Sequence, residues 1–258
     1  MNYRDIRFQV EEGIGFITLN RPEKRNALSM NLMAEMVDLL RSVKTNPEIR
    51  AVIIRGEGPV FSAGHDLAEM LEGNVVSYRR AFDACTEMMQ AIRDLPQPVI
   101  AQVQGIAAAA GCQLVATCDL AVAETGARFA TPGVRIGLFC HTPQVPLSRT
   151  IGPKRALEML FTGRFISAEE AERYGLVNKV VPADRLAEET LSLAKHIVQA
   201  SPLTLALGKK SFYRQIELEE RGAYDYASEM MALNAMTEDA REGISAFLQK
   251  REPQWQGK

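Results

Sequence analysis

Residues 98–124 read PVIAQVQGIAAAAGCQLVATCDLAVAE, and the other patterns in the chain are best understood from this stretch. A strand-like apolar segment at 99–103 runs into Gly105, small residues follow at 107–111, and an apolar segment continues to Cys118. β-branched residues favour strands, and small residues at a turn let another group approach the backbone closely. The pattern therefore predicts a strand, a turn of small residues and the start of a helix.

The same order occurs earlier in the chain. Residues 50–56, RAVIIRG, are rich in β-branched residues, and a Gly/Pro loop then leads to FSAGHDL at 61–67 and a helical segment. The first N–H groups of a helix lack partners within the helix and lie at the positive end of its dipole. Two such groups that meet at one carbonyl oxygen form an oxyanion hole. The repeated unit predicts such a site, and two tight turns packed for structural reasons are the alternative.

The composition is that of a globular protein of ordinary size. The 258 residues are 47% hydrophobic and 24% charged, which fits one domain, alone or with a smaller appendage. The net charge of −2 provides no basic surface for nucleic acid or an anionic membrane, so neither is expected as a partner. The longest apolar stretch, 99–123, is interrupted by Gln102, Gln104, Gln113 and Asp119, so no membrane span is expected.

Cysteine and histidine usage bears on the compartment and on metal binding. Four cysteines lie mostly in apolar surroundings without close metal-ligand pairing: Cys85, Cys112, Cys118 and Cys140. They are expected to be reduced thiols. The three histidines also lack metal-ligand spacing, so no metal site is expected: His65, His141 and His196. The N-terminus is charged throughout and resembles no targeting peptide, which predicts a cytoplasmic location, or the mitochondrial matrix if a transit peptide was removed.

Alternating strand and helix patterns run up to about residue 200 and predict parallel strands joined by helical crossovers. A hairpin is expected at 6–19, Ser29 is expected to cap a long helix, and Ser167 with Glu170 has the spacing of a capping box. Further helices are expected at 77–93, 154–162 and 182–199, and further strands at 51–55, 119–124, 128–130 and 177–181.

The pattern changes near residue 201, after which only helical segments rich in methionine and aromatic residues follow. Helical regions of this kind often serve docking or assembly. We therefore divide the chain into a core at 1–200, which holds the predicted site, and a helical assembly region at 201–258.

A set of short motifs runs along the chain. They are NRP at 20–22 with NAL at 26–28, FSAGHDL at 61–67, AGCQL at 110–114, CDL at 118–120, FTG at 161–163 and FLQKR at 247–251. Together they resemble the crotonase superfamily, the enoyl-CoA hydratase/isomerase family, over essentially the whole chain. GHDL, AAAAGCQLVA, FATPGV and GLFC are most similar to one branch of it. The resemblance implies an α/β fold, a ClpP/crotonase-like spiral of ββα units, with a helical C-terminal trimerisation region.

The resemblance also implies a ligand and an assembly. The ligand is an acyl-CoA thioester, with CoA as part of the substrate and no permanently bound cofactor, and the assembly is a homotrimer or a dimer of trimers. The two oxyanion N–H groups fall on Ala63 and Ala110, where a thioester enolate binds. Further implied contacts with the acyl-CoA are Lys24, Arg25, Ala27, Gly64, His65, Asp66, Leu67, Gly133, Phe139 and Cys140, and from a neighbouring subunit Met231 and Lys250. Without the resemblance, the basic residues around Lys24 would be assigned to a solvated surface.

Two positions depart from the family's pattern. Hydratases of the family carry a pair of glutamates that activate water, and these positions hold Gln113 and Gly133 here. A glutamine amide does not titrate near neutral pH and glycine has no side chain, whereas general acid–base catalysis contributes about 10²–10⁴-fold. Efficient hydration is therefore not expected, although acyl-CoA binding and enolate stabilisation are. Gln113 is expected to be a hydrogen-bonding residue of the pocket rather than inert filler, holding a water or a substrate oxygen.

Three functions remain open: an enzyme of the lyase or isomerase type, a decarboxylase and a catalytically weak acyl-CoA-binding protein. Methylmalonyl-CoA decarboxylases of the family also have a GHD segment, in which the histidine holds the leaving carboxylate, so His65 is a candidate for that role. The alternative is an ordinary loop histidine. Asp66 is expected to be an N-cap with capping-box spacing to Glu69 rather than a base. Cys140 is expected to be a wall of the acyl pocket rather than a nucleophile paired with His141, because adjacent side chains seldom reach the required geometry.

Overall fold

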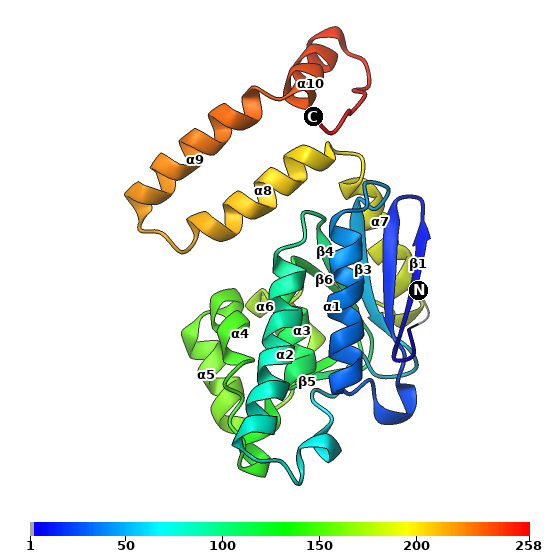
Figure 1. The fold of residues 1–258 in the computed structure, drawn as a ribbon, viewed down its shortest axis with the longest axis vertical. Helices are drawn as coiled ribbons and strands as arrows, with labels where there is room; N and C mark the ends of the chain where they lie inside the picture. The colour runs from blue at the N-terminus through cyan, green and yellow to red at the C-terminus, as the bar shows by residue number, and fades with distance from the viewer. Residues whose placement is uncertain (1–2) are drawn as a thin grey trace.

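Six strands form the central sheet of the structure, a computed structural model that describes residues 3–258 (Figure 1). Their order is β1-β2-β3-β4-β6-β9, in which the first pair is antiparallel and every other pair is parallel. The bounds are β1 (Ile6–Glu11), β2 (Ile14–Leu19), β3 (Ala51–Gly56), β4 (Val99–Val103), β6 (Leu120–Glu124) and β9 (Lys179–Val181).

Three short strands form a second sheet in the order β5-β7-β8. They are β5 (Ile106–Ala108), β7 (Arg128–Ala130) and β8 (Ile166–Ser167). The chain passes from β4 directly into β5 and then into a helix, and it passes from β6 into β7 in the same way. These two turns of the chain thus each give one strand to each sheet. This confirms the predicted α/β spiral of ββα units.

Helices cover both faces of the central sheet. On one face, α1, α2 and α3 share the main hydrophobic core with inward residues such as Ile17 and Ile54. On the other face, Ala194 of α7 packs on Ile53 and Ile100, which follows from the alternation of side chains along a strand. The bounds are α1 (Met30–Lys44), α2 (Val75–Arg93), α3 (Ala110–Thr117), α4 (Gln144–Ile151), α5 (Pro153–Thr162), α6 (Ala168–Tyr174) and α7 (Leu186–Ile197).

Several local signals in the sequence are confirmed. Residues Ile6–Glu11 and Ile14–Leu19 form the expected hairpin. Ser29 caps α1 by accepting a hydrogen bond from the Leu32 N–H at 3.1 Å. Ser167 and Glu170 form the reciprocal capping box of α6.

Other expectations are corrected. Asp66 does cap a short 3₁₀ helix, η2 (Leu67–Met70), but it forms no capping box with Glu69. The Glu69 carboxylate instead accepts from the Met30 N–H at 2.9 Å, which ties η2 to the start of α1. After β7 the chain forms another 3₁₀ helix, η3 (Pro132–Ile136), which the sequence pattern did not predict. Strands β5 and β8 were not expected, because they are too short to carry an alternating pattern.

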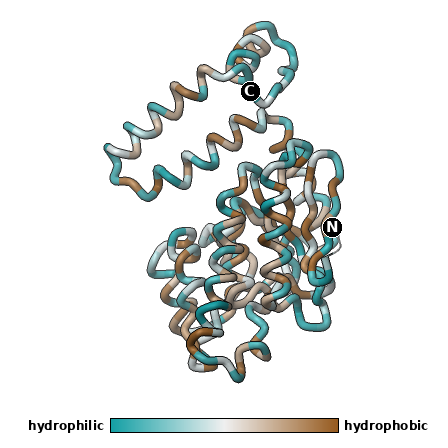
Figure 2. Tube along the Cα trace, viewed as in Figure 1, coloured by the Kyte–Doolittle hydropathy of each residue, from teal (hydrophilic) through white to brown (hydrophobic). Residues whose placement is uncertain are grey.

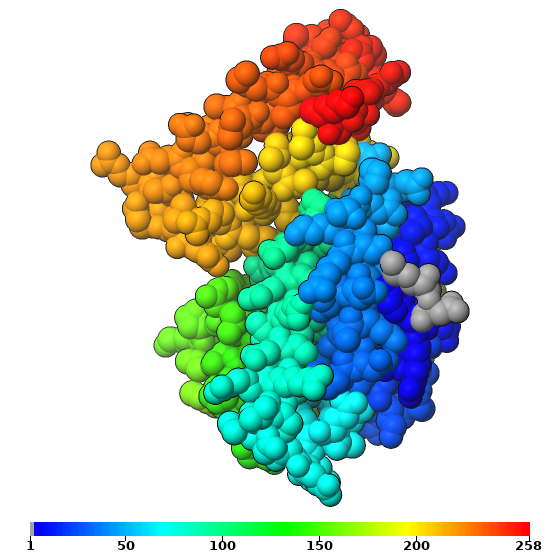
Figure 3. Space-filling model, viewed as in Figure 1, coloured from blue at the N-terminus to red at the C-terminus, as the bar shows by residue number. Residues whose placement is uncertain are grey.

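The last three helices leave the body of the molecule. They are α8 (Pro202–Gln215), α9 (Glu220–Ala235) and α10 (Glu238–Gln249). Figure 1 and Figure 3 show them as a projection beyond one end of the sheet, and Figure 2 shows polar and apolar residues mixed along α8 and α9. Neither α8 nor α9 has a buried residue. The helix-only region is confirmed, whereas its role in assembly stays a prediction.

Candidate functional site

Two loops meet where the predicted oxyanion hole lies. One follows β3 and contains Gly64, and the other joins β5 to α3 at Ala109 and Ala110. Gly64 has a φ of +98°, and a Cβ placed on it would lie 2.8 Å from the Cβ of Ala109 and 3.1 Å from the nitrogen of Ala110. Only glycine fits a contact this close with that backbone conformation. The contact brings the residues that follow Gly64 next to the first N–H groups of α3.

The free N–H groups differ in part from the prediction. The assignment of Ala63 as an oxyanion donor is wrong, because its N–H donates to the carbonyl oxygen of Arg25 at 3.0 Å. The N–H of Asp66 is also used, by the carbonyl oxygen of Leu28 at 3.2 Å. Between them, the N–H of His65 donates to no atom of residues 3–258. The unpaired N–H of this loop is therefore that of His65, and Ala63 remains only as a wall of the cavity.

Ala110 begins α3, and its N–H has no acceptor in the part of the chain that the structure describes. The preceding residue, Ala109, has φ 50° and ψ −119°, a backbone conformation that residues other than glycine rarely adopt. Its own N–H is held by the carbonyl oxygen of Ala130 at 2.9 Å. The strained residue turns the chain sharply out of β5, and the following N–H is left unpaired beside the other loop.

A cavity of about 510 Å³ opens at these two N–H groups. His65, Ala109 and Ala110 line it, and most other side chains on its wall are apolar. The apolar residues include Leu67, Phe82, Pro132, Ile136, Leu138 and Phe139. We refer to it as the large cavity. Its volume and its combination of apolar walls with a few polar groups are typical of a small-molecule site.

The position of the second hydratase glutamate is closed in this structure. A Cβ on Gly133 would overlap the carbonyl oxygen of Leu138 and would lie 2.8 Å from the sulfur of Cys140. Burial raises the pKa of the Cys140 thiol, so the sulfur is protonated near neutral pH. His141 is exposed, and its ring lies 5.0 Å from that of Phe139. Cys140 is therefore a wall of the large cavity, as predicted.

The His65 side chain lies between two cavities. It lines the large cavity and also a smaller one of about 270 Å³ between the start of α1, η2 and α2. Its ring stands edge-on to Phe82, with centroids 5.6 Å apart, and its buried Nε2 has no partner among residues 3–258. Burial lowers the pKa of His65 from 6.5, so the imidazole is neutral near pH 7. A neutral ring with a free nitrogen can bind or transfer a proton.

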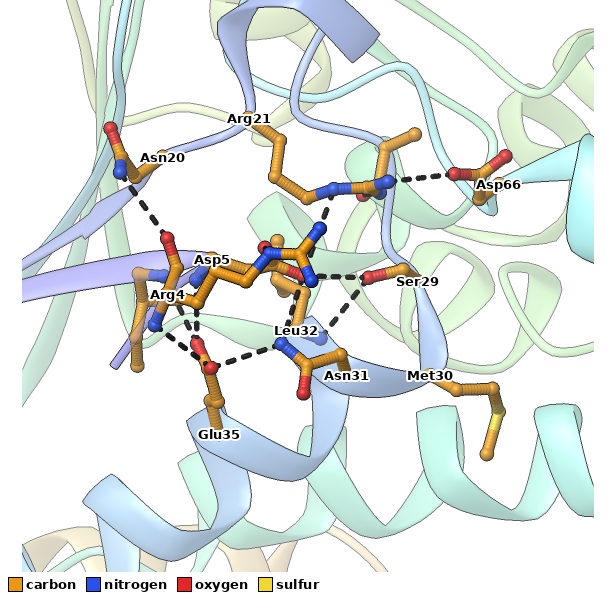
Figure 4. A network of polar contacts seen from close by, with 12 residues as sticks. Arg4, Asp5, Asn20, Arg21, Ser29, Met30, Asn31, Leu32, Glu35 and Asp66 are labelled. Atoms are coloured by element: carbon orange, nitrogen blue, oxygen red, sulfur yellow. Dashed lines mark hydrogen bonds and ion pairs between the residues drawn. The ribbon is translucent and has the colours of Figure 1, made fainter. Parts of the chain in front are cut away.

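Arg21 holds the loop that carries His65, a role that the sequence interpretation missed (Figure 4). Its guanidinium donates to the carboxylate of Asp66 at 2.9 Å and to the carbonyl oxygen of Ala27 at 2.7 Å. The other Asp66 oxygen accepts from the Ala68 N–H at 3.2 Å. Asp5, which is buried, lies 3.7 Å from Arg21 and accepts from Ser29 at 3.1 Å. Asp66 is thus an N-cap rather than a free base, as expected, and it is also an ion-pair partner of Arg21, which was not expected.

Gln113 lies in a neighbouring cavity rather than in the large one. It is buried on α3 and lines a cavity of about 270 Å³ between α2, α3 and α4. Its side-chain amide makes no hydrogen bond to any residue from 3 to 258. The sequence predicted a hydrogen-bonding residue of the pocket, whereas the structure places Gln113 in the cavity next to the one at the N–H groups of His65 and Ala110.

The predicted CoA contacts fall into two groups. Lys24 and Arg25 are exposed at the end of η1 (Pro22–Lys24), close in sequence to the loop that contacts Gly64, and their side chains are unpaired within residues 3–258. Met231 on α9 and Lys250 after α10 lie on the projection (Figure 1), and they line none of the cavities described above. Within one chain they are not part of the site, so a role for them requires a neighbouring subunit.

No group of three or more metal-ligating side chains occurs in residues 3–258. The four cysteines are buried free thiols. Over the same residues, no helix has the length and apolar character needed to cross a bilayer.

Comparison with known proteins agrees with the geometry. The family model for enoyl-CoA hydratase/isomerase matches residues 9–258. The chain is 48% identical over 247 residues to enoyl-CoA hydratase domain-containing protein 3, mitochondrial, of Mus musculus, covering 95% of this chain and 82% of that protein. The likeness that the motifs indicate, to the family and to this branch of it, is confirmed.

Solved structures show the same similarity. A crystal structure of an enoyl-CoA hydratase from Mycobacterium smegmatis superposes with a TM-score of 0.95 at 47% identity, covering 98% of this chain and 99% of that one. The crystal structure of human enoyl-CoA hydratase domain-containing protein 3 gives a TM-score of 0.95 at 46% identity, covering 98% and 100%.

Proposed function

Because the chain belongs to the enoyl-CoA hydratase/isomerase family and has its crotonase fold, we propose that it binds an acyl-CoA thioester and stabilises the thioester enolate. The observation that carries this proposal is the pair of unused N–H groups, of His65 and Ala110, at the mouth of an apolar cavity. The thioester oxygen accepts a hydrogen bond from each group. The removal of one such donor typically costs about 10²–10³-fold in kcat.

The large cavity holds the acyl group in this proposal. Among residues 3–258, no aspartate or glutamate is on its wall, and its titratable side chains are His65, Arg135, Cys140 and His141. Hydration requires a base to activate water, so a site without carboxylates supports enolate chemistry of the lyase or isomerase type better than efficient hydration. No cofactor is needed, because CoA arrives with the substrate.

Decarboxylation is the second candidate, and the unpartnered Nε2 of His65 favours it. In a malonyl-type thioester, the bond between Cα and the carboxylate breaks, CO₂ leaves, and the electron pair forms the enolate. The N–H groups of His65 and Ala110 hold the enolate oxygen until Cα takes a proton. This sequence requires no carboxylate base, and the neutral imidazole of His65 can orient the leaving carboxylate through a water or pass a proton from solvent to Cα, so that the ring is neutral again at the end.

The same proposal includes an assembly and a location. Lys24 and Arg25 contact the CoA nucleotide, and Met231 and Lys250 of a neighbouring subunit close over it in a homotrimer or a dimer of trimers. The apolar residues exposed on the projection support this assembly, because a neighbouring subunit would cover them. The proposed location is the cytoplasm or the mitochondrial matrix. The relative named enoyl-CoA hydratase domain-containing protein 3 is described as mitochondrial.

Incubation with a small set of thioesters tests the function. Crotonyl-CoA, a 3-enoyl-CoA and methylmalonyl-CoA are each mixed with the wild-type protein, His65→Ala and Ala110→Pro, and the products are identified by mass spectrometry. Ala110→Pro removes one N–H and should abolish turnover, because proline is accepted at the first helical position but cannot donate. Thermal unfolding verifies that the variant is folded.

Each function gives a different result. Decarboxylation lost in His65→Ala supports the second candidate, and isomerisation retained in that variant supports the first. Binding without any product supports a catalytically weak acyl-CoA-binding protein. Rapid hydration of crotonyl-CoA would contradict the expectation that Gln113 and Gly133, in place of two glutamates, prevent efficient hydration.

A further inference from the structure

The cavity between α2, α3 and α4 has several polar and charged side chains on its wall, and the mechanism above does not use it. Gln113 and Thr117 of α3 line it together with Arg93 of α2 and Arg149 of α4. Thr142 lines both this cavity and the large cavity, so the two are neighbours. We refer to it as the arginine cavity.

Two buried polar groups in the arginine cavity lack partners. Gln113 is 4% exposed, and its Oε1 is buried without a hydrogen bond within residues 3–258. The Nε of Arg93 is likewise buried and unpaired among the residues described. Leaving such groups unsatisfied costs folding free energy, and native proteins seldom do so. An acceptor from outside the chain would satisfy the Nε–H of Arg93, whereas the Oε1 of Gln113 needs a donor such as water.

The charges of the arginine cavity indicate what that occupant is. Arg93 and Arg149 give it two positive charges, and Glu217 is the one carboxylate among its lining residues. The guanidinium of Arg93 lies 4.0 Å above the ring of Tyr213, which holds its plane in place. Guanidinium groups bind carboxylates through paired charged hydrogen bonds. The excess positive charge and the unpaired Nε–H of Arg93 therefore fit a carboxylate, and the NH₂ group of the Gln113 amide can donate to it as well.

The position of the arginine cavity connects it to the thioester site. Ala110, whose N–H is assigned to the thioester oxygen, and Gln113 are three residues apart on α3 and share one face of the helix. Three residues rise roughly 4.5 Å along a helix. An acyl chain that starts at Ala110 and continues past Thr142 would thus reach the arginine cavity.

We propose that the arginine cavity binds the carboxylate at the far end of the acyl group, so that the ligand is the CoA thioester of a dicarboxylic acid. This inference rests on the proposed function of the two N–H groups. It assigns Arg93, Arg149 and Gln113 as residues that determine specificity.

Isothermal titration of the full chain with two saturated thioesters tests the inference. Hexanoyl-CoA and adipyl-CoA have acyl chains of the same length, and only adipyl-CoA ends in a carboxylate. Adipyl-CoA should bind about tenfold more tightly, because a buried charged hydrogen bond contributes about that factor. Arg93→Gln should narrow this difference, whereas Glu217→Gln, which removes the opposing charge at an exposed position, should widen it. Arg41→Gln, at a surface ion pair with Glu87, is the control and should change neither affinity.

Opposite responses of Arg93→Gln and Glu217→Gln would support a carboxylate site, because a purely structural role predicts no gain in either variant. Equal affinities of the wild type for the two thioesters would overturn the inference while leaving the proposed function intact. Failure of both thioesters to bind would overturn the proposed function as well. Free adipate is tested in parallel: if it binds in an Arg93-dependent manner while the thioesters bind equally, the arginine cavity takes free carboxylates and the assignment to the acyl chain is wrong.

Discussion

His65 contributes two separate groups to the site, a main-chain N–H and an imidazole. Which N–H of the loop is free depends on the loop at Arg25, which takes up the N–H of Ala63. That partner is distant in sequence, so the FSAGHDL motif alone identified the loop but not the donor. The neighbours of His65 in the sequence identified its imidazole as a candidate. They could not predict that the ring is buried beside Phe82, which is distant in sequence.

The buried imidazole predicts a dependence of stability on pH. Burial places the pKa of His65 in the folded chain below 6.5, whereas the unfolded chain binds the proton near 6.5. Lowering the pH through 6.5 therefore favours unfolding. At higher pH the imidazole is neutral in both the folded and the unfolded chain, so it has no effect. When the pH is lowered from about 8 to about 5.5, the melting temperature of His65→Gln should fall less than that of the wild type. Parallel losses in differential scanning fluorimetry would show that His65 is protonated without cost in the folded state.

Ala109 has a φ of 50°, which costs about 1–3 kcal/mol for a residue with a side chain. Ala109→Gly should therefore leave the free energy of unfolding unchanged or raise it. Ala107→Gly, at a buried position of β5, is the matched control and should lose about 0.5–1 kcal/mol. Urea unfolding measures both, and equal losses would contradict the strain assigned to Ala109.

Gly133 cannot accept the glutamate of a hydratase in the present loop. Gly133→Glu should destabilise the fold by about 1–3 kcal/mol, because its side chain would overlap Leu138. It should also fail to increase hydration of crotonyl-CoA. Gly126→Glu, at an exposed position where a Cβ would make only an ordinary contact at 3.6 Å from the Glu124 carboxylate, controls for the added side chain. A stable Gly133→Glu variant that hydrates crotonyl-CoA would show that the loop adapts.

At the scale of elements, caps were predictable and the shortest strands were not. Ser29 and Ser167 act on helices that begin next to them in the chain, so their signals are local. Strand β5 has only three residues and exists because it pairs with Arg128–Ala130 and contacts Ser62. The site depends on that pairing, since β5 leads directly into the strained turn before α3.

Helix α8 is anchored to the core by an ion pair whose side chains are only 7% and 15% exposed, which predicts an effect on stability. The Lys209 ammonium lies 2.7 Å from the Asp119 carboxylate, and Tyr213 donates to the same carboxylate at 2.7 Å. Lys209→Met should lower the free energy of unfolding by about 3–5 kcal/mol, because it leaves a buried charge without its partner.

Lys195→Met breaks an exposed pair with Glu12 and serves as the control, with an expected loss of at most about 1 kcal/mol. Guanidinium unfolding of the two variants measures the difference. Similar small losses in both would mean that Lys209 does not hold α8.

At the scale of the whole molecule, the projection of α8, α9 and α10 exposes many apolar side chains. The most exposed are Tyr224, Met231, Met236, Phe247 and Leu248, each at least 70% exposed. The sequence predicted a helical assembly region from its composition. The structure describes one chain, so the assembly through this surface and the number of subunits remain predictions.

Size-exclusion chromatography with light scattering tests the assembly. The wild type should have the mass of three or six chains of 28.5 kDa. Phe247→Asp should shift it toward single chains and weaken acyl-CoA binding, because a charge is costly in a buried apolar interface. Val10→Asp changes an exposed apolar residue on β1 and should leave the mass unchanged. A wild type that elutes as single chains would contradict the proposed trimer.

The proposal that the N–H groups of His65 and Ala110 polarise a thioester is tested most directly by infrared spectroscopy of a bound acyl-CoA. A ¹³C label at the thioester carbonyl separates its stretching band from those of the protein. If both groups donate to the oxygen, the band should shift to lower frequency on binding to the wild type and to His65→Ala, which keeps the N–H. The shift should be smaller in Ala110→Pro. A thioester that binds with an unshifted carbonyl band would show that these N–H groups do not form an oxyanion hole.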